Sequence, residues 1–522
     1  AQLRFSTSNA DYLNKSDPAW VGNQAYTSRF GGDPMVVLFT MNKGRTVDNL
    51  FTPQNQAEMT RVETALNKDP WVFDVISPLD AMNFTASLLQ GNLLTTPAAT
   101  LFTSAYARDT NQKSKDARWN YLIAQAHAIA KFTPATEKME NPQWIHFVTH
   151  EVDGSWRQAV KAFMPNPQHA LMAIILKPNL DFNQEIKAAA TVEAITKHAS
   201  YDNTATLTTG VPEVEKVISD YLRAGLRKLT LIAAAAMVII LLLTFSVRWR
   251  LLPFAVLAIG LLWGFGLVGY FGVPLTFATI TALPTLMGVG MDYAIQMHSR
   301  IEEEVVLDRS AHPIQAAARG LGPALLVVTF DAVFAFMALW FSKIPAMRQF
   351  GSLMVIGIVA VCIGSIILTL AALGIREYRS PTTGKDFSKG ILSRVVVRLG
   401  SLPAKAAVPC VVLAALVFAG GISVEGKLVL QSNPIQWLNP NSQAVKQINI
   451  LKTATQSDNQ LGMVVTTDHP FSDQTINYVV KLTNTEAKKY GNLLFPGAGL
   501  ISSINGFLSV PGSKEVPPTG DQ

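Results

Sequence analysis

The sequence has little charge. Only 15% of its 522 residues are Asp, Glu, Lys or Arg, whereas 49% are hydrophobic, and the mean hydropathy is +0.24. About one quarter of a typical soluble domain is charged, so this composition argues against a soluble protein and indicates a membrane protein. The formal net charge of +6 does not indicate a nucleic-acid partner, because the basic residues cluster beside apolar runs.

Cysteine is nearly absent. The two cysteines, Cys362 and Cys410, both lie inside apolar runs, where a cysteine usually packs as a small hydrophobic residue. This excludes a disulfide-stabilised scaffold and a cysteine-ligated metal centre. We predict no cofactor, no metal site and no catalytic residues, and therefore a protein that is not an enzyme.

Long uncharged runs are abundant. A membrane-spanning helix needs roughly 20 apolar residues, because the hydrocarbon core is about 30 Å thick. The charge-free stretch 251–291 is too long for one helix, and we divide it at Gly272-Val273-Pro274. The sequence thus predicts six spans, at residues 229–247, 251–271, 275–298, 321–342, 349–375 and 406–424.

Lys and Arg predict which side of the membrane each loop occupies, because basic loops stay in the cytoplasm. The loops after the first, third and fifth spans contain the basic residues Arg248, Arg250, Arg300, Arg309, Arg319, Arg376, Arg379, Lys385, Lys389, Arg394, Arg398 and Lys405. The opposite connections contain only Lys343 and Arg348. Residues 1–228 and the segment after residue 424 are therefore predicted to lie outside the cytoplasm. Residues 387–400 combine apolar and basic residues at helical spacing, which predicts an amphipathic helix on the inner membrane surface rather than a plain linker.

The two outer segments share a repeat. Residues 12–17, 35–40 and 75–83 match residues 437–442, 463–468 and 500–508 in pattern. Leu13 and Leu438, Met35 and Met463, and Val75 and Leu500 are 425, 428 and 425 residues apart, and this agreement favours a duplication over chance. By the same spacing, we expect a first helix ahead of Ala1 and further segments after the second copy.

The first outer segment is predicted to be α+β. Strand-helix-strand patterns occur at residues 35–77 and again at 170–212, which suggests a pair of ferredoxin-like subdomains. Residues 81–131 are predicted to be mostly helical. In "HFVTHE" (146–151) the β-branched residues favour a strand with both histidines on one exposed face, so we expect no metal there despite the spacing. Likewise "RIEEEVVLDR" (300–309) is interpreted as a solvated cytoplasmic helix.

Two acids lie within the predicted spans. Ionised carboxylates in hydrocarbon are costly, so Asp292 and Asp331 are expected to be neutral, paired or on a wet path. Asp292 lies six residues before His298, roughly 9 Å along a helix, and Asp331 lies ten residues after Leu321, roughly 15 Å. We predict a proton relay of Asp292, Tyr293 and Asp331. The supporting polar and small residues are Gly288, Gly290, Gln296 and Thr329. Alternatively, each acid is neutral and only packs between helices.

Five motifs carry a family resemblance. They are "RFGGDPMVV" (29–37), "LFTPQ" (50–54), "TTGVPEV" (208–214), "GVGMDYAIQMHSR" (288–300) and "FSKIPAMRQFG" (341–351). With them the chain resembles the resistance-nodulation-division (RND) superfamily, most closely its hydrophobe/amphiphile efflux branch, which is akin to the mycobacterial membrane protein large (MMPL) exporters and the Patched-like sterol-sensing proteins. The most specific motif is Gly-x-x-x-Asp-Tyr, at Gly288, Asp292 and Tyr293.

The resemblance implies a helical bundle with ferredoxin-like porter domains on the extracytoplasmic side of a bacterial or archaeal inner membrane. In this arrangement residues 1–228 are the first porter domain, 229–375 are helices 2–6, 376–405 are a cytoplasmic linker, 406–424 are helix 7, and 425–522 begin a second porter domain. The implied activity is proton-driven export of lipids, drugs or other amphiphiles, with protons and membrane lipids as the other partners, no nucleic acid, and a homo-oligomer left open. The alternatives are a non-pumping lipid-sensing protein of the Patched-like type and an accessory to protein translocation.

Overall fold

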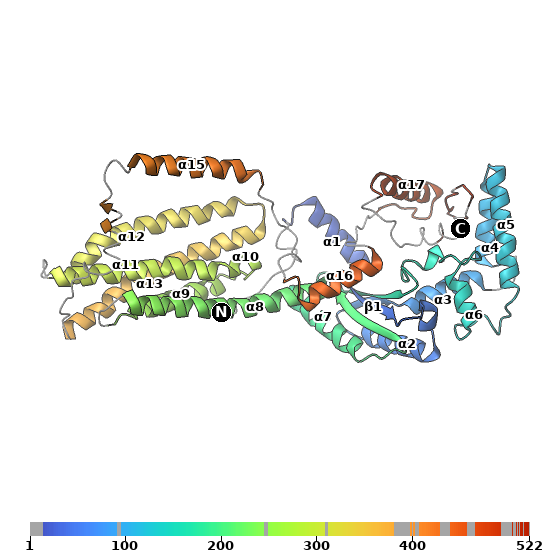
Figure 1. The fold of residues 1–522 in the computed structure, drawn as a ribbon, viewed down its shortest axis with the longest axis horizontal. Helices are drawn as coiled ribbons and strands as arrows, with labels where there is room; N and C mark the ends of the chain where they lie inside the picture. Colours follow the sequence, from blue (N-terminus) through green and yellow to red (C-terminus); the bar gives the residue numbers. More distant parts are fainter. Residues whose placement is uncertain are drawn as a thin grey trace. The chain divides into compact units, whose positions relative to one another are not determined.

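The chain forms two compact units. The computed structural model describes residues 14–90, 96–244, 249–307, 312–379, 397–398, 400–401, 407–427, 439–456, 465–491, 504, 508, 510, 512–514 and 516–520. One unit, here the helical unit, comprises Ala1–Asp17 and Ser219–Trp437, and the other, here the α+β unit, comprises Pro18–Ile218 and Leu438–Gln522. Figure 1 shows the elements of both units.

The helical unit contains long apolar helices. Its described helices are the C-terminal part of α8 (Val211–Thr244), then α9 (Leu252–Tyr270), α10 (Phe277–Ile280), α11 (Ala282–Leu307), α12 (Pro313–Met337) with the short η4 (Ala338–Phe341), α13 (Pro345–Arg379) and α15 (Ala407–Glu425). Four segments are long and apolar enough to cross a membrane, namely Leu252–Tyr270, Pro313–Phe341, Pro345–Arg376 and Val408–Glu425.

These four segments correspond to four of the six predicted spans. The other two predicted spans fall on α8 and α11, which are helical but are not among the described helices apolar enough to count as spans. Their crossing of the membrane stays a prediction. The predicted break after the second span is present, since α9 ends at Tyr270 and Gly272 has a positive φ of 69°, a conformation that glycine adopts without steric cost. The predicted surface helix at residues 387–400 lies outside the described residues, apart from residues 397–398 and 400.

Helix α13 is the centre of the bundle and packs against α9, α11 and α12 (Figure 1). Glycines bring α9 and α13 close together. A Cβ atom added to Gly264 of α9 would lie 3.2 Å from the Cα of Gly357, and one added to Gly260 would lie 3.1 Å from the Cα of Val361. Small residues at such a crossing let two backbones approach closely, which stabilises helix pairs in a membrane through van der Waals contact.

The α+β unit is built on one antiparallel sheet. Its strands are β1 (Pro34–Met41), β2 (Val72–Ile76), β3 (His169–Leu176) and β4 (Thr204–Gly210), in the order β2-β3-β1-β4. Helix α2 (Pro53–Asn67) connects β1 to β2, and α7 (Phe182–Lys197) connects β3 to β4. The predicted strand-helix-strand elements are therefore confirmed.

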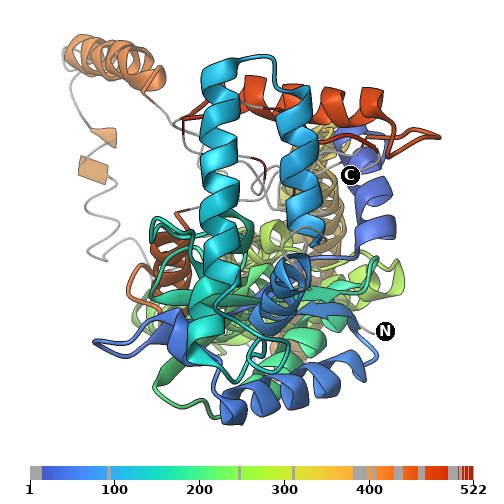
Figure 2. The ribbon, with the colours of Figure 1, turned by 90° about the vertical axis from the view of Figure 1, so that its right-hand side faces the viewer.

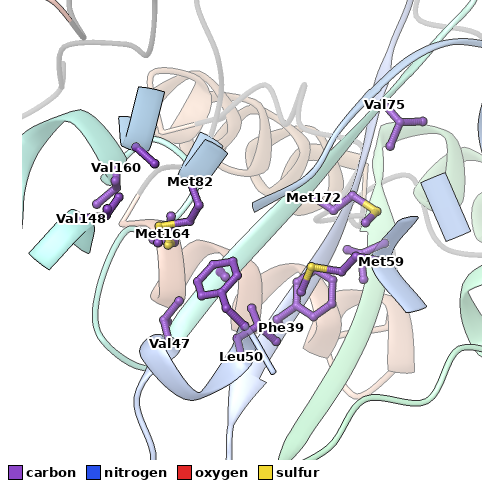
Figure 3. Packing of buried hydrophobic residues seen from close by; sticks show 14 of the residues in the cluster. Phe39, Val47, Leu50, Met59, Val75, Met82, Val148, Val160, Met164 and Met172 are labelled. Carbon is purple, nitrogen blue, oxygen red and sulfur yellow. The ribbon is translucent and has the colours of Figure 1, made fainter. Parts of the chain in front are cut away.

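The two strand-helix-strand units do not form a pair of subdomains, and this detail of the prediction is wrong. They interleave, because β1 pairs with β3 on one edge and with β4 on the other, so that Met35 lies opposite both Ile174 and Gly210. Sharing one sheet lets both units bury their apolar strand faces in one core. Figure 3 shows part of that core, where Phe39, Met59 and Met172 pack together.

The region between β2 and β3 is helical, and the prediction of helices at residues 81–131 is confirmed. It contains α3 (Pro78–Leu89), α4 (Pro97–Arg108), α5 (Gln112–Ile129) and α6 (Pro142–Thr149). The side chains of Ser77, Thr96 and Asn111 each cap the following helix by accepting a backbone hydrogen bond, which satisfies one of the free N–H groups at a helix start. Figure 2 shows α4 and α5 side by side as an antiparallel pair.

The prediction of a strand at residues 146–151 is wrong, because residues 142–149 form α6. Asn141 caps this helix, Pro142 occupies its first turn, and Trp144, Ile145 and Val148 are buried at helical spacing. A proline at the first helical position and a burial pattern with a period of three to four residues both favour a helix. These signals outweigh the β-branched residues.

The C-terminal segment packs into the same α+β unit. Arg118 of α5 is buried, pairs with Asp109 at 3.1 Å, and donates hydrogen bonds to the carbonyl oxygens of Leu508, at 2.6 Å, and Lys514. Leu508 and Val510 join the hydrophobic core of the sheet. The assignment of residues 425–522 to a second porter domain stays a prediction.

Two helices agree with the proposed duplication. Helix α1 (Pro18–Phe30) and α16 (Gln443–Thr455) both have 13 residues, and they begin 425 residues apart, as the repeat requires. The second copy continues with α17 (Asp473–Lys489). The matched blocks at residues 12–17, 437–442, 463–468 and 500–508 lie partly outside the described residues.

We expect Gly264→Leu to destabilise the helical unit by about 1–3 kcal/mol, because the added side chain overpacks the contact with α13. Gly266 on the same helix is the matched control, since a Cβ atom there has no neighbour within 4 Å among the described residues. Unfolding in mixed detergent micelles measures both variants. Equal stability of Gly264→Leu and Gly266→Leu would show that the crossing is not tightly packed.

Candidate functional site

The acid motif lies on α11, and the helix presents two different faces. Leu286, Gly290, Tyr293 and Met297 recur every three to four residues and are buried, packed against α9, α12 and α13. The opposite face is exposed along a line of residues that includes Gly288, Asp292 and Gln296. We call this line the Asp292 stripe. A period of 3.6 residues separates the two faces.

Gly290 is the reason that α11 can lie so close to its neighbours. A Cβ atom at this position would lie 2.5 Å from Leu257 Cδ1 of α9 and 2.5 Å from Val361 Cγ1 of α13. Gly288 is different, because a Cβ atom there would meet no described atom within 4 Å. Of these two glycines, Gly290 is therefore the one that lets the described helices approach each other closely.

Asp292 is exposed on the stripe rather than enclosed between helices. The sequence places this acid within a predicted span, and the described residues do not cover it. The physical reason is the position of Asp292 on the helix, since the packed face is set by Gly290, Tyr293 and Met297 and the acid lies on the side away from them.

Tyr293 points inward, toward α12 and α13. Its hydroxyl is close enough to Thr329, Cys362 and Asp292 to interact with them electrostatically. None of the described groups forms a hydrogen bond with this hydroxyl. Thr329 is buried, donates to the carbonyl oxygen of Leu325 at 2.7 Å, and contacts Cys362 Sγ at 3.1 Å. Tyr293 thus links the Asp292 stripe to a small polar group between α12 and α13.

The second acid lies on α12. Asp331 is exposed on α12, on a face that also carries the exposed Val327, Phe330 and Phe334. Among the described residues, none of the hydrogen bonds or ion pairs joins Asp331 to Asp292, Gln296 or Tyr293. The structure therefore brings Tyr293 and Thr329 together, whereas the part of Asp331 in the relay stays a prediction.

A buried charged cluster lies further along α11, and the sequence analysis missed it. Glu302 accepts a hydrogen bond from Arg376 Nη1 of α13 at 3.0 Å, and His298 Nε2 lies 3.1 Å from the same carboxylate oxygen. All three side chains are at most 3% exposed. The carboxylate thus ties α11 to α13 within the bundle.

Glu302 was predicted to be solvated because it stands beside Glu303 and Glu304 in an acidic run. The helical periodicity does indicate that Glu302 is buried. Ala294 and His298 are buried one turn apart, and Glu302 follows one turn later on the same face. Its partner Arg376 is 74 residues away, so the pairing itself is not visible locally.

Residues 32–380 match the MMPL family, which is more than half of the chain. The chain belongs to the MMPL family. The match includes the whole sheet, the Asp292 stripe and the Glu302 cluster. The members of this family are transporters rather than enzymes, and the four long apolar helices of this chain indicate a multi-pass membrane location.

A relative supports the membrane assignment. The chain is 26% identical over 178 residues to a Methanocaldococcus jannaschii protein described as a membrane protein. That alignment covers 33% of this chain and 45% of the relative, so the chain spans less than half of the length of the relative that it matches.

Removing Glu302 should strongly destabilise this MMPL-family protein, because Arg376 would be left buried without its carboxylate. We expect Glu302→Ala to lower the free energy of unfolding by about 3–5 kcal/mol, and the double variant Glu302→Leu with Arg376→Leu to recover most of that loss. Glu303→Ala is the control, since Glu303 is exposed and its pair with Arg300 should contribute at most about 1 kcal/mol. Similar losses for Glu302→Ala and Glu303→Ala would contradict the buried-pair interpretation.

Proposed function

We propose that this MMPL-family chain exports hydrophobic or amphiphilic molecules, such as lipids or drugs, and that the proton gradient drives the export. The observation that carries the proposal is the carboxylate of Asp292 on a predicted membrane-spanning helix, beside Tyr293. A carboxylate at membrane depth is costly to keep ionised, and such residues commonly mark ion or proton paths.

The geometry suggests how protonation would be sensed. Asp292 faces the exposed stripe, whereas the adjacent Tyr293 faces Thr329 and Cys362 between α12 and α13. Neutralising Asp292 removes a charge from one side of α11 and changes the field at the tyrosine on the other side. The packing of α11 against α12 and α13 is then the element that responds to the proton.

The energy of the gradient is sufficient for such a cycle. Moving one charge through a potential of about 100 mV supplies about 2.3 kcal/mol. That amount shifts a two-state equilibrium by roughly fiftyfold.

The α+β unit is proposed to be the porter domain that handles the substrate. Its sheet follows the order expected of a ferredoxin-like fold, and the basic loops predict that it lies outside the cytoplasm, with the helices in the inner membrane. The lipid-sensing alternative uses the same fold but does not need a proton-exchanging acid within a membrane span. The presence of Asp292 therefore favours the pump.

We expect Asp292→Asn to reduce export driven by a pH gradient by at least about tenfold, because the amide cannot exchange a proton at this position. The measurement is extrusion of a fluorescent amphiphile from proteoliposomes with and without the gradient. Glu303→Gln is the matched control, since it removes a carboxylate from an exposed part of the same helix. Gradient-driven export by Asp292→Asn at the unmodified rate would refute the proton relay.

Asp331→Asn in the same assay decides the role of the second acid. Loss of gradient dependence would place Asp331 in the relay with Asp292 and Tyr293, as the sequence predicts. An unchanged gradient dependence would remove it from the relay and leave Asp292 as the coupling group.

A further inference from the structure

A group of metal-ligand side chains lies in the α+β unit, away from the Asp292 stripe in sequence and in a different compact unit. Asp48, His146 and His150 each offer a donor atom, and these atoms all lie within 4.8 Å of one another. Proton-coupled export does not need this group of side chains. Their close arrangement therefore requires an explanation of its own.

We propose that Asp48, His146 and His150 form a binding site for a divalent transition-metal ion of the zinc class. The proposal goes beyond transport and does not depend on it. Two imidazoles and one carboxylate are typical ligands of Zn²⁺, and three protein ligands leave a fourth position open for water or for a bound anionic or carbonyl group.

The local fold brings the two histidines together. Because residues 142–149 form α6, His146 lies one turn before His150, which is the C-terminal cap residue. Their rings are 4.0 Å apart between centroids and tilted by 31°. Two histidines separated by four residues on a helix present their nitrogens to one side, as in helical zinc sites. In the predicted strand the same residues would not approach so closely.

The carboxylate comes from a distant part of the chain. Asp48 lies on η2 (Val47–Leu50), which packs against α6. Its Oδ2 atom lies 2.9 Å from His146 Nδ1 and 3.9 Å from His150 Nδ1. Ligand atoms around a tetrahedral zinc are separated by roughly 3.3 Å, given zinc–nitrogen bonds of about 2.0–2.1 Å. The two observed distances lie on either side of this separation, so small side-chain rotations suffice.

Groups around the ligands hold them in place. Thr149 donates to Asp48 Oδ1 at 2.8 Å, which orients the carboxylate so that Oδ2 faces the histidines. Arg157 is buried and donates to the carbonyl oxygens of Val148, at 3.1 Å, and His150, at 2.7 Å, which anchors the end of α6. Hydrogen bonds to ligands and to the backbone behind them typically support metal affinity.

The group is open to solvent on the side of His146. The side chain of His146 is 59% exposed, so an ion can reach the group from solvent.

Zinc binding to the full-length protein in detergent, purified with a tag that contains no histidine, tests the site. We expect one equivalent of Zn²⁺ per chain near neutral pH, and a loss of affinity of at least about 100-fold in His146→Ala and in His150→Ala. His127→Ala is the matched control, because His127 is an exposed histidine on α5 outside the group. Isothermal titration with Zn²⁺ gives both the affinity and the stoichiometry.

The visible spectrum of bound Co²⁺ is a second measurement. A residue that only stabilises the fold would leave this spectrum unchanged when it is substituted. Co²⁺ bound by two nitrogens and a carboxylate absorbs visible light according to its coordination geometry, and Asp48→Asn should alter this spectrum while the far-ultraviolet circular dichroism stays the same. Unchanged Zn²⁺ affinity in both histidine variants would overturn the proposal. Equal loss in His127→Ala would do so as well, because it would show adventitious binding to surface histidines.

Discussion

The close crossing of α9, α11 and α13 at small residues decides how the helical unit is arranged. In a membrane the apolar surfaces of helices gain little from leaving lipid, so contact between backbones supplies much of the stabilisation. Gly260 and Gly264 permit that contact, and Gly290 makes room for side chains of α9 and α13. Because Gly290 faces α9 and α13, the rotation of α11 is set, and Asp292 lies on its exposed side while Tyr293 lies within the bundle.

The α+β unit depends on a different constraint, which is the pairing of β1 on both of its edges. Because β3 and β4 flank β1, the segments between the strands are brought to one core. Buried arginines complete the unit, since Arg118 holds the C-terminal segment and Arg157 holds the end of α6. These arginines donate hydrogen bonds to backbone carbonyl oxygens. A buried carbonyl oxygen without a hydrogen-bond partner is energetically costly, so these bonds stabilise the unit.

Sequence patterns predicted the elements that local forces determine. The helix at 53–67 and the strands around it follow from a cap, a proline and alternating burial. Features that depend on distant partners were missed or misjudged. Asp48 and His146 are 98 residues apart and Glu302 and Arg376 are 74 apart, so neither pair is visible in a local window. The exposure of Asp292 depends on the rotation of α11, which Gly290 sets through contacts with two other helices.

The proposed proton coupling requires that Asp292 exchanges protons in an apolar setting. A hydrophobic carbodiimide reacts with protonated carboxyl groups that lie near lipid, and peptide mass spectrometry locates the modified residue. The account predicts modification of Asp292 in membranes near neutral pH, with a rate that falls as the pH rises and with little reaction at the exposed Glu303. Absence of reaction at Asp292, or reaction no faster than at Glu303, would contradict it.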